Sequence, residues 1–149
     1  MLRYTQGDLF ASGAQLLVNP VNCVGVMGKG LALAFKERFP SNFVRYKQVC
    51  DAKELEPGKI LFVEIDGEDP RWIANLPTKR HWRQKSRLED VRAGLSALAE
   101  EIRTRQISSV AIPALGAGLG GLDWADVKAV IADELGELSG VEITVFEPR

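Results

Sequence analysis

The chain has 149 residues, of which 46% are hydrophobic and 26% charged, and its formal net charge is −1. These values are typical of one soluble domain that is large enough to bury most of its apolar surface. They exclude a protein that attracts polyanions through its overall charge, and no apolar run approaches the ~20 residues that a membrane-spanning helix needs. The N-terminus lacks a signal-peptide pattern, so we expect a cytoplasmic location and no membrane contact.

Hydrophobic patterning predicts alternating strands and helices along the chain. We expect an edge strand over 1–6, a buried strand over 15–19 that breaks at Pro20, a hairpin from 59–65 and 71–76, a strand over 109–115 and a last strand over 141–146. Helices are predicted after Gly30 as far as Pro40, over 41–52, over 87–105 and after Asp123.

Short polar residues mark several of the predicted turns and helix starts. Asp8 is placed to cap a short helix or to bind a ligand donor, and Asp123 to cap the last helix. Ser86 and Glu89 have the spacing of a capping box for the helix over 87–105. The resulting order of elements predicts an α/β fold: a three-layer α-β-α sandwich around a mixed sheet of about six strands, in a single domain over 1–149.

Two glycine-rich loops each follow a predicted buried strand and precede a helix. The first glycine loop covers 22–30 and the second covers 116–121. Glycines let backbone N–H groups approach phosphate, and the helix dipole favours the anion, so we expect the two loops to cradle one diphosphate. The second loop also matches the G-x-G-x-x-G pattern, but only one strand follows it, which disfavours a nicotinamide-cofactor oxidoreductase.

The two cysteines, Cys23 and Cys50, form neither a disulfide framework nor a metal site, and we expect no metal and no cofactor. Cys23 lies in the first glycine loop. No His lies near it in the sequence, so an apolar filler is favoured over a nucleophile.

A basic stretch connects the hairpin to the long helix. Five Lys or Arg occur among the nine residues from Lys79 to Arg87, with the only His of the chain and one of its three Trp. Single-stranded DNA requires cations for its phosphates and flat side chains for its bases. We therefore predict a DNA contact, although a solvated surface stripe and a core role for Trp82 remain open: Arg80, His81, Trp82, Arg83 and Lys85.

Taken together, these motifs resemble a macrodomain. The resemblance rests on Gly7-Asp8-Leu9-Phe10, on Asn22 with Met27-Gly28-Lys29-Gly30-Leu31-Ala32, on Thr78-Lys79-Arg80, on Pro113-Ala114-Leu115-Gly116-Ala117-Gly118-Leu119 and on Ile143-Thr144-Val145-Phe146. It covers nearly the whole chain. The chain is similar to the branch that contains terminal ADP-ribose protein glycohydrolase and, more closely, the DarG antitoxins of DarTG toxin–antitoxin systems.

This resemblance implies that the chain binds ADP-ribose. Asp8 would accept from the adenine amino group, Phe146 would pack on the adenine, and Asn22 would face the distal ribose. Backbone of both glycine loops would wrap the diphosphate and the distal ribose. The full set of implied ADP-ribose contacts is Asp8, Leu9, Asn22, Met27, Gly28, Lys29, Gly30, Gly116, Ala117, Gly118, Leu119, Gly120 and Phe146.

The resemblance also implies a nucleophile, Lys79, which would attack the anomeric carbon and form a covalent lysyl adduct. Such a lysine must lose its proton, so its pKa must fall from the reference of ~10.4 toward ~7–8. Burial or an adjacent cation lowers a lysine pKa, and Arg80 could be that cation.

One position departs from the family pattern. Terminal ADP-ribose protein glycohydrolase has a catalytic Asp where this chain has Gly120, which argues against release from glutamate-linked substrates by that route. The DarG-like alternative is ADP-ribose on thymine in single-stranded DNA, removed by a monomeric antitoxin whose partner is a DNA ADP-ribosyltransferase toxin. An ADP-ribose reader and a hydrolase of protein-linked ADP-ribose are the remaining alternatives, and the natural antitoxins continue beyond this domain.

Overall fold

The computed structural model describes residues 1–67 and 69–148. One six-stranded sheet, ordered β1-β6-β5-β2-β4-β3, forms the middle layer. Its first five strands in that order run parallel, and β3 pairs antiparallel with β4, which confirms the predicted hairpin. The strands are β1 (Leu2–Thr5), β2 (Leu16–Val21), β3 (Leu61–Glu64), β4 (Trp72–Pro77), β5 (Ser109–Ile112) and β6 (Glu142–Phe146).

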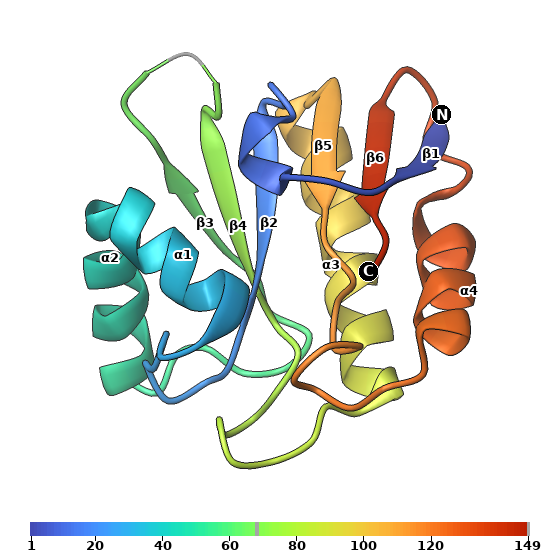
Figure 1. Ribbon diagram of the computed structural model, residues 1–149. Coiled ribbons are helices and arrows are strands. Elements are labelled where there is room, and N and C mark those ends of the chain that lie inside the picture. Colours follow the sequence, from blue (N-terminus) through green and yellow to red (C-terminus); the bar gives the residue numbers. More distant parts are fainter. Residues whose placement is uncertain (68, 149) are drawn as a thin grey trace.

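Helices cover both faces of this sheet, as the predicted three-layer sandwich requires (Figure 1). On one face lie α1 and α2, and on the other α3 and α4 pack against each other. A 3-10 turn, η1, follows β1. The helices are η1 (Leu9–Ala11), α1 (Gly30–Arg38), α2 (Pro40–Asp51), α3 (Leu88–Arg105) and α4 (Trp124–Leu135).

The largest core cluster lies between the sheet and the α3–α4 layer. It includes Leu95 and Leu98 of α3 and Val127 and Ile131 of α4, all with 0% exposure. Smaller clusters lie under α1, around Phe35, and under α2, around Tyr46. These helical residues recur at steps of three and four, which explains why the periodicity of the sequence predicted the helices correctly.

The central strand is longer than predicted, and its extension opens the sheet. β2 continues through Pro20 to Val21, paired with β4 as far as Pro77. Its pairing with β5 involves only Leu16 and Leu17. Pro20 lies beyond the β5 ladder and is tolerated, because it has no N–H to offer there. The separation of β2 from β5 places a crevice at the carboxyl ends of parallel strands, where such sheets bind ligands.

The predicted capping box of α3 is wrong. The helix begins at Leu88 with Arg87 as its N-cap, and no side chain caps it there. Ser86 lies outside the helix, and its Oγ is buried without a hydrogen-bond partner among the described residues. The predicted caps Asp8 and Asp123 are confirmed, since Asp8 accepts from Phe10 N at 2.9 Å and Asp123 from Ala125 N at 3.0 Å.

Two classes of feature were sought without result. Within residues 1–67 and 69–148, no helix combines the length and the apolar character needed to cross a membrane. The same residues contain no group of three or more His, Cys, Asp or Glu that could hold a metal ion.

Candidate active site

The segment 78–87, which we call the basic loop, leaves β4 and enters α3. Its start is bonded to the end of β2, because the N–H groups of Thr78 and Lys79 donate to Val21 O at 2.9 and 3.4 Å. The Arg80 carbonyl accepts from Cys23 N at 3.3 Å. Lys79 itself is half-buried. The backbone of Lys79 is therefore held directly against the first glycine loop.

The other end of the basic loop lies on the second glycine loop. Ser86 N donates to Gly120 O at 2.9 Å, and a Cβ placed on Gly121 would lie 3.7 Å from Lys85 Cδ. The two glycine loops also meet each other, because a Cβ on Gly30 would lie 3.4 Å from Leu119 Cδ1. Three segments that are far apart in the sequence thus converge, as the sequence analysis expected.

The first glycine loop ends at an open helix N-terminus. Gly28, Lys29 and Gly30 are exposed, and α1 begins at Gly30 with Lys29 as its N-cap. A lysine side chain carries no acceptor, so it cannot satisfy the first N–H groups of α1. These donors, together with the positive end of the helix dipole, suit an anionic group such as a diphosphate.

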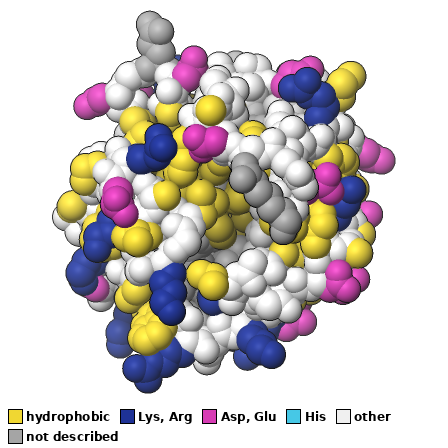
Figure 2. All heavy atoms as spheres, viewed as in Figure 1, with side chains coloured by type: hydrophobic (Ala, Val, Ile, Leu, Met, Phe, Trp, Pro, Cys, Tyr) yellow, Lys and Arg dark blue, Asp and Glu magenta, His cyan; other side chains and the backbone are white. Residues whose placement is uncertain are grey.

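A hollow lies beside these loops on the face drawn in Figure 2. It contains hydrophobic side chains, and comparison with Figure 1 places it between α1 and the end of β6. Lys and Arg side chains gather below it and to its left, whereas acidic side chains are spread along the α4 side of the view. The separation of charge inferred from the sequence is thus visible on the surface.

A family model described as Macro domain matches residues 18–131. The chain belongs to the macrodomain family. A DNA ADP-ribosyl glycohydrolase of Thermus aquaticus is 47% identical over 99% of this chain and 41% of its own length. The chain thus spans about two fifths of the length of the curated relatives it matches most strongly.

Two solved structures are similar over the full macrodomain. The macrodomain of Mycobacterium tuberculosis DarG has a TM-score of 0.98 and 44% identity, covering 100% of this chain and 99% of that one. Thermosipho africanus DarTG in complex with ADP-ribose has a TM-score of 0.91 and 38% identity, covering 99% of this chain and 41% of that one. The resemblance drawn from the sequence motifs is therefore confirmed at the level of family and fold.

At the adenine end of the macrodomain cleft, Asp8 and Phe146 come from opposite ends of the chain. Asp8 caps η1 with one carboxylate oxygen. Leu9 is 4% exposed and belongs to the same core cluster that Phe146 packs against. The structure brings the three residues together, and it leaves Leu9 only its backbone for a ligand. Their roles toward adenine stay predictions.

Asn22 has a different environment from the one expected. Its Oδ1 accepts from Val24 N at 3.0 Å and from Val26 N at 3.4 Å, and its Nδ2 donates to Val26 O at 2.8 Å. The buried Tyr46 hydroxyl lies 2.8 Å from both Asn22 oxygens. Asn22 thus shapes the first glycine loop from within. Met27 is similarly enclosed, with 1% exposure, so only its backbone faces the cleft.

Gly120 has no space for a side chain. A Cβ at this position would overlap the Ser86 Oγ and the Gly116 carbonyl. The family's acidic residue therefore cannot replace Gly120 in this loop. The remaining glycine-loop residues divide by exposure: Gly118 and Leu119 are exposed, Ala117 is half-buried and Gly116 is buried.

The tip of the basic loop carries stacked rings. Trp82 is 46% exposed, which excludes the core role left open by the sequence. The Arg83 guanidinium lies 4.6 Å from the centroid of the Trp82 ring, and the His81 ring lies 5.5 Å from it. Arg83 N donates to His81 Nδ1 at 3.1 Å, so this nitrogen is unprotonated. Lys85 is exposed beside this tip.

Arg80 differs from the other predicted DNA contacts. Its guanidinium forms two bonds with Asp90 of α3, Nε to Oδ2 at 3.2 Å and Nη2 to Oδ1 at 3.3 Å. Because Asp90 balances its charge, Arg80 is a poor candidate for the cation that lowers the Lys79 pKa. Sequence reasoning missed Asp90, Tyr46 and the buried Ser86 hydroxyl. Only an acid in a helical first turn, Asp90, carried any signal.

Cys23 lies with its Sγ 3.6 Å from the Lys79 carbonyl. Burial raises the pKa of this thiol to about 11, with the buried Asp90 among the groups that contribute. A thiol that stays protonated at neutral pH is a poor nucleophile. The predicted role of Cys23 as a filler is therefore in agreement with its environment.

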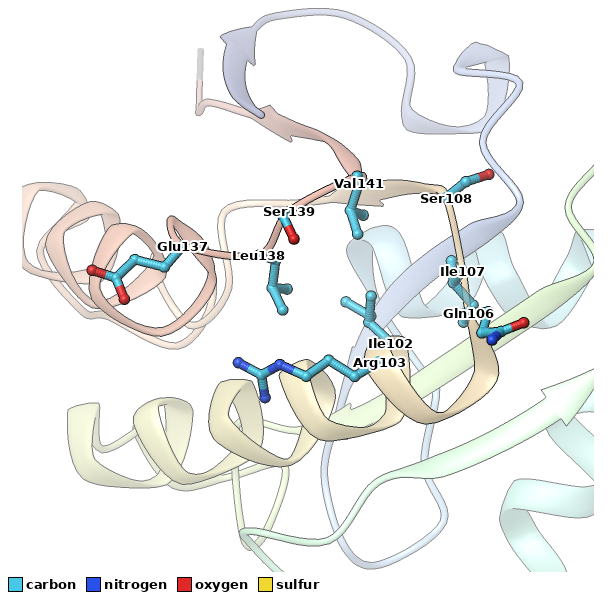
Figure 3. Close-up of a pocket in the computed structure, with 10 residues that line it drawn as sticks. Ile102, Arg103, Gln106, Ile107, Ser108, Glu137, Leu138, Ser139 and Val141 are labelled. Carbon is cyan, nitrogen blue, oxygen red and sulfur yellow. The ribbon is translucent and has the colours of Figure 1, made fainter.

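A second hollow, of about 400 Å³, lies at the opposite edge of the sheet (Figure 3). Its walls come from the end of α3 and from the connections into β5 and β6, with Ile102, Leu138 and Val141 among the lining residues. Arg103 and Glu137 are its charged residues. It contains none of the predicted site residues, so we place the active site at the carboxyl edge.

Proposed function

We propose that this chain removes ADP-ribose from thymine bases in single-stranded DNA, with Lys79 as the nucleophile. One observation carries the proposal. The loop that holds Lys79 is bonded to both glycine loops, and its tip presents an exposed Trp beside Arg and Lys side chains. The names of relatives with 45–47% identity, DNA ADP-ribosyl glycohydrolase, support the same chemistry.

The reaction would proceed in two steps. The Lys79 amine attacks the anomeric carbon of the distal ribose, the bond between that carbon and the thymine breaks, and the base takes up a proton. Water then attacks the same carbon, which releases ADP-ribose and restores the amine. In this scheme the enzyme contributes position above all, since the cradle holds the sugar carbon within reach of one amine.

The basic loop also bears on the choice of substrate. Unpaired bases can stack on the exposed Trp82, and phosphates can bind Arg83 and Lys85. In contrast, the closed position at Gly120 leaves no room for the acid expected of enzymes that act on glutamate-linked ADP-ribose. Both features favour a DNA substrate over a protein substrate.

The wider role follows from the relatives' names. We propose that the chain acts as a monomeric antitoxin domain in the cytoplasm and opposes a DNA ADP-ribosyltransferase. A relative from Thermosipho africanus, 37% identical, is named as a fusion of a DNA ADP-ribosyl transferase and a DNA ADP-ribosyl glycohydrolase. A fusion of this kind supports a direct functional partnership between the two activities.

The decisive experiment offers two substrates in parallel. One is a single-stranded oligonucleotide with one ADP-ribosylated thymine, and the other is a protein with glutamate-linked ADP-ribose. We expect release of ADP-ribose from the oligonucleotide only. Release from the protein only would refute the proposal. Tight binding of ADP-ribose with no release from either substrate would show a reader instead of an enzyme.

A further inference from the structure

The carboxylate of Asp90 is buried beside the active site. Asp90 lies in the first turn of α3 and is 5% exposed. Both of its oxygens accept hydrogen bonds from Arg80, at 3.2 and 3.3 Å. A two-point bond between a guanidinium and a carboxylate fixes orientation as well as distance. A buried charge that loses its partner is strongly destabilised, so this pair has a strong tendency to stay closed.

The same pair determines where Lys79 begins. Arg80 is fixed twice, by its side chain on α3 and by its carbonyl, which accepts from Cys23 N at 3.3 Å. On the other side of Lys79, the Thr78 N–H donates to Val21 O at 2.9 Å. With both neighbours held, the Cα–Cβ direction of Lys79 is set by the backbone, and only its rotamers remain free.

We propose that the Arg80–Asp90 pair is a positioning device for Lys79, which acts through the backbone of the basic loop without touching the substrate. This inference rests on the proposed function, because it takes Lys79 as the nucleophile. It also reassigns Arg80. The guanidinium that sequence reasoning gave to DNA is held on α3, which leaves the phosphates to the exposed cations farther along the loop.

The chain offers a matched control in the next residue. Asp90→Asn removes the buried charge with little change of shape, and Glu89→Gln removes an exposed charge from the same helical turn. A misplaced reacting group slows chemistry by up to about 100-fold. We expect kcat on the modified oligonucleotide to fall about 10- to 100-fold in Asp90→Asn, with the Kd for free ADP-ribose within about three-fold of wild type. Glu89→Gln should change neither.

A purely structural role would lower kcat and ADP-ribose affinity together, so this split is the test. Arg80→Gln should show the same split, and it decides the matter if Asp90→Asn fails to fold. The double variant should be no slower than the slower single variant, because both remove one interaction. Wild-type kcat in Asp90→Asn, or a matching loss of ADP-ribose affinity, would overturn the inference.

Trypsin supplies a readout that does not depend on activity, since the basic loop contains five Lys or Arg. Asp90→Asn should be nicked within 78–87 faster than both wild type and Glu89→Gln. If wild-type protein cleaves neither substrate, the proposed function fails. Unchanged nicking, with wild-type activity intact, would refute the positioning role alone.

Discussion

The two halves of the basic loop are held in different ways. From Thr78 to Arg80, bonds run outward to β2, to the first glycine loop and to α3. From His81 to Gln84, the described bonds run within the segment itself, from Gln84 N to His81 O and from Arg83 N to His81 Nδ1. A nucleophile needs a fixed place, whereas a surface that receives a flexible strand can adapt. The difference assigns chemistry to the first half and DNA contact to the second.

The largest effect should come from Lys79→Ala, which removes the nucleophile. We expect cleavage of the modified oligonucleotide to fall at least about 1,000-fold, as when nucleophiles are removed from other enzymes. Affinity for free ADP-ribose should change little, because the backbone cradle remains. Single-turnover kinetics and calorimetry measure the two quantities, with Lys59→Ala as a control at an exposed lysine away from the loops. Activity retained in Lys79→Ala would remove the first half of the loop from the mechanism.

Gly120→Ala tests how tightly the far end of the loop is packed. The added methyl would overlap Ser86 Oγ and the Gly116 carbonyl, and overpacking of this kind destabilises by about 1–3 kcal/mol. Gly118→Ala is the matched control, since nothing lies within 4 Å of a Cβ there. Thermal unfolding should separate the two variants. Equal melting temperatures would show that the second glycine loop yields easily.

Trp82→Ala tests the adaptable half. Loss of one stacked base lowers affinity by about 1–3 kcal/mol, or roughly 5- to 150-fold. Because Trp82 is 46% exposed, the melting temperature should stay near that of wild type. Fluorescence anisotropy with a labelled single strand measures the effect, and a duplex of the same sequence serves as control. Unchanged affinity for the single strand would remove Trp82 from the DNA contact.

Salt dependence sharpens the contrast between cations in the two halves. Each phosphate contact on a single strand contributes about 0.7 to the slope of log K against log salt. The double variant Arg83→Gln/Lys85→Gln should therefore reduce the slope by about 1.4. Arg80→Gln should reduce it by much less, because Asp90 already holds that guanidinium. Equal reductions per cation would place Arg80 on the DNA.

The smallest effect is expected at Cys23. Burial raises the pKa of its thiol from 9.0 to about 11, so folding favours the protonated form. The associated stabilisation is complete below pH 9 and is lost as the pH rises toward 11. Iodoacetamide should modify Cys23 slowly at pH 8, and Cys23→Ser should retain the wild-type cleavage rate. Rapid alkylation at pH 8, followed by mass spectrometry, would contradict this environment.

Much of the fold could be read from the sequence, because periodicity and turn residues are local signals. The stripe of Leu95 and Leu98 predicted α3, and Asp8 and Asp123 predicted their caps. The convergence of the glycine loops was also predictable, since parallel strands end at one edge of the sheet. The end of β2 was not, because the tolerance for Pro20 depends on how far β5 pairs with its neighbour.

Side-chain partners within the site were harder to predict. Ser86 and Glu89 have the spacing of a capping box, yet the loop geometry turns Ser86 toward Gly120 instead. Arg80 and Asp90 are ten positions apart on two elements, and no local pattern links them. Asn22 has the residue type expected to face a sugar, but Tyr46, on a distant helix, draws its side chain into the loop. Tertiary contacts made each of these choices.

The closed space around Gly120 also bears on ancestry. An aspartate could enter this position only if the Gly116 turn and Ser86 changed at the same time. Lineages of the fold that differ here are then separated by several coupled substitutions, and the intermediates between them would be poorly folded. Exchange of one linkage specificity for another should accordingly be a rare event in the history of these proteins.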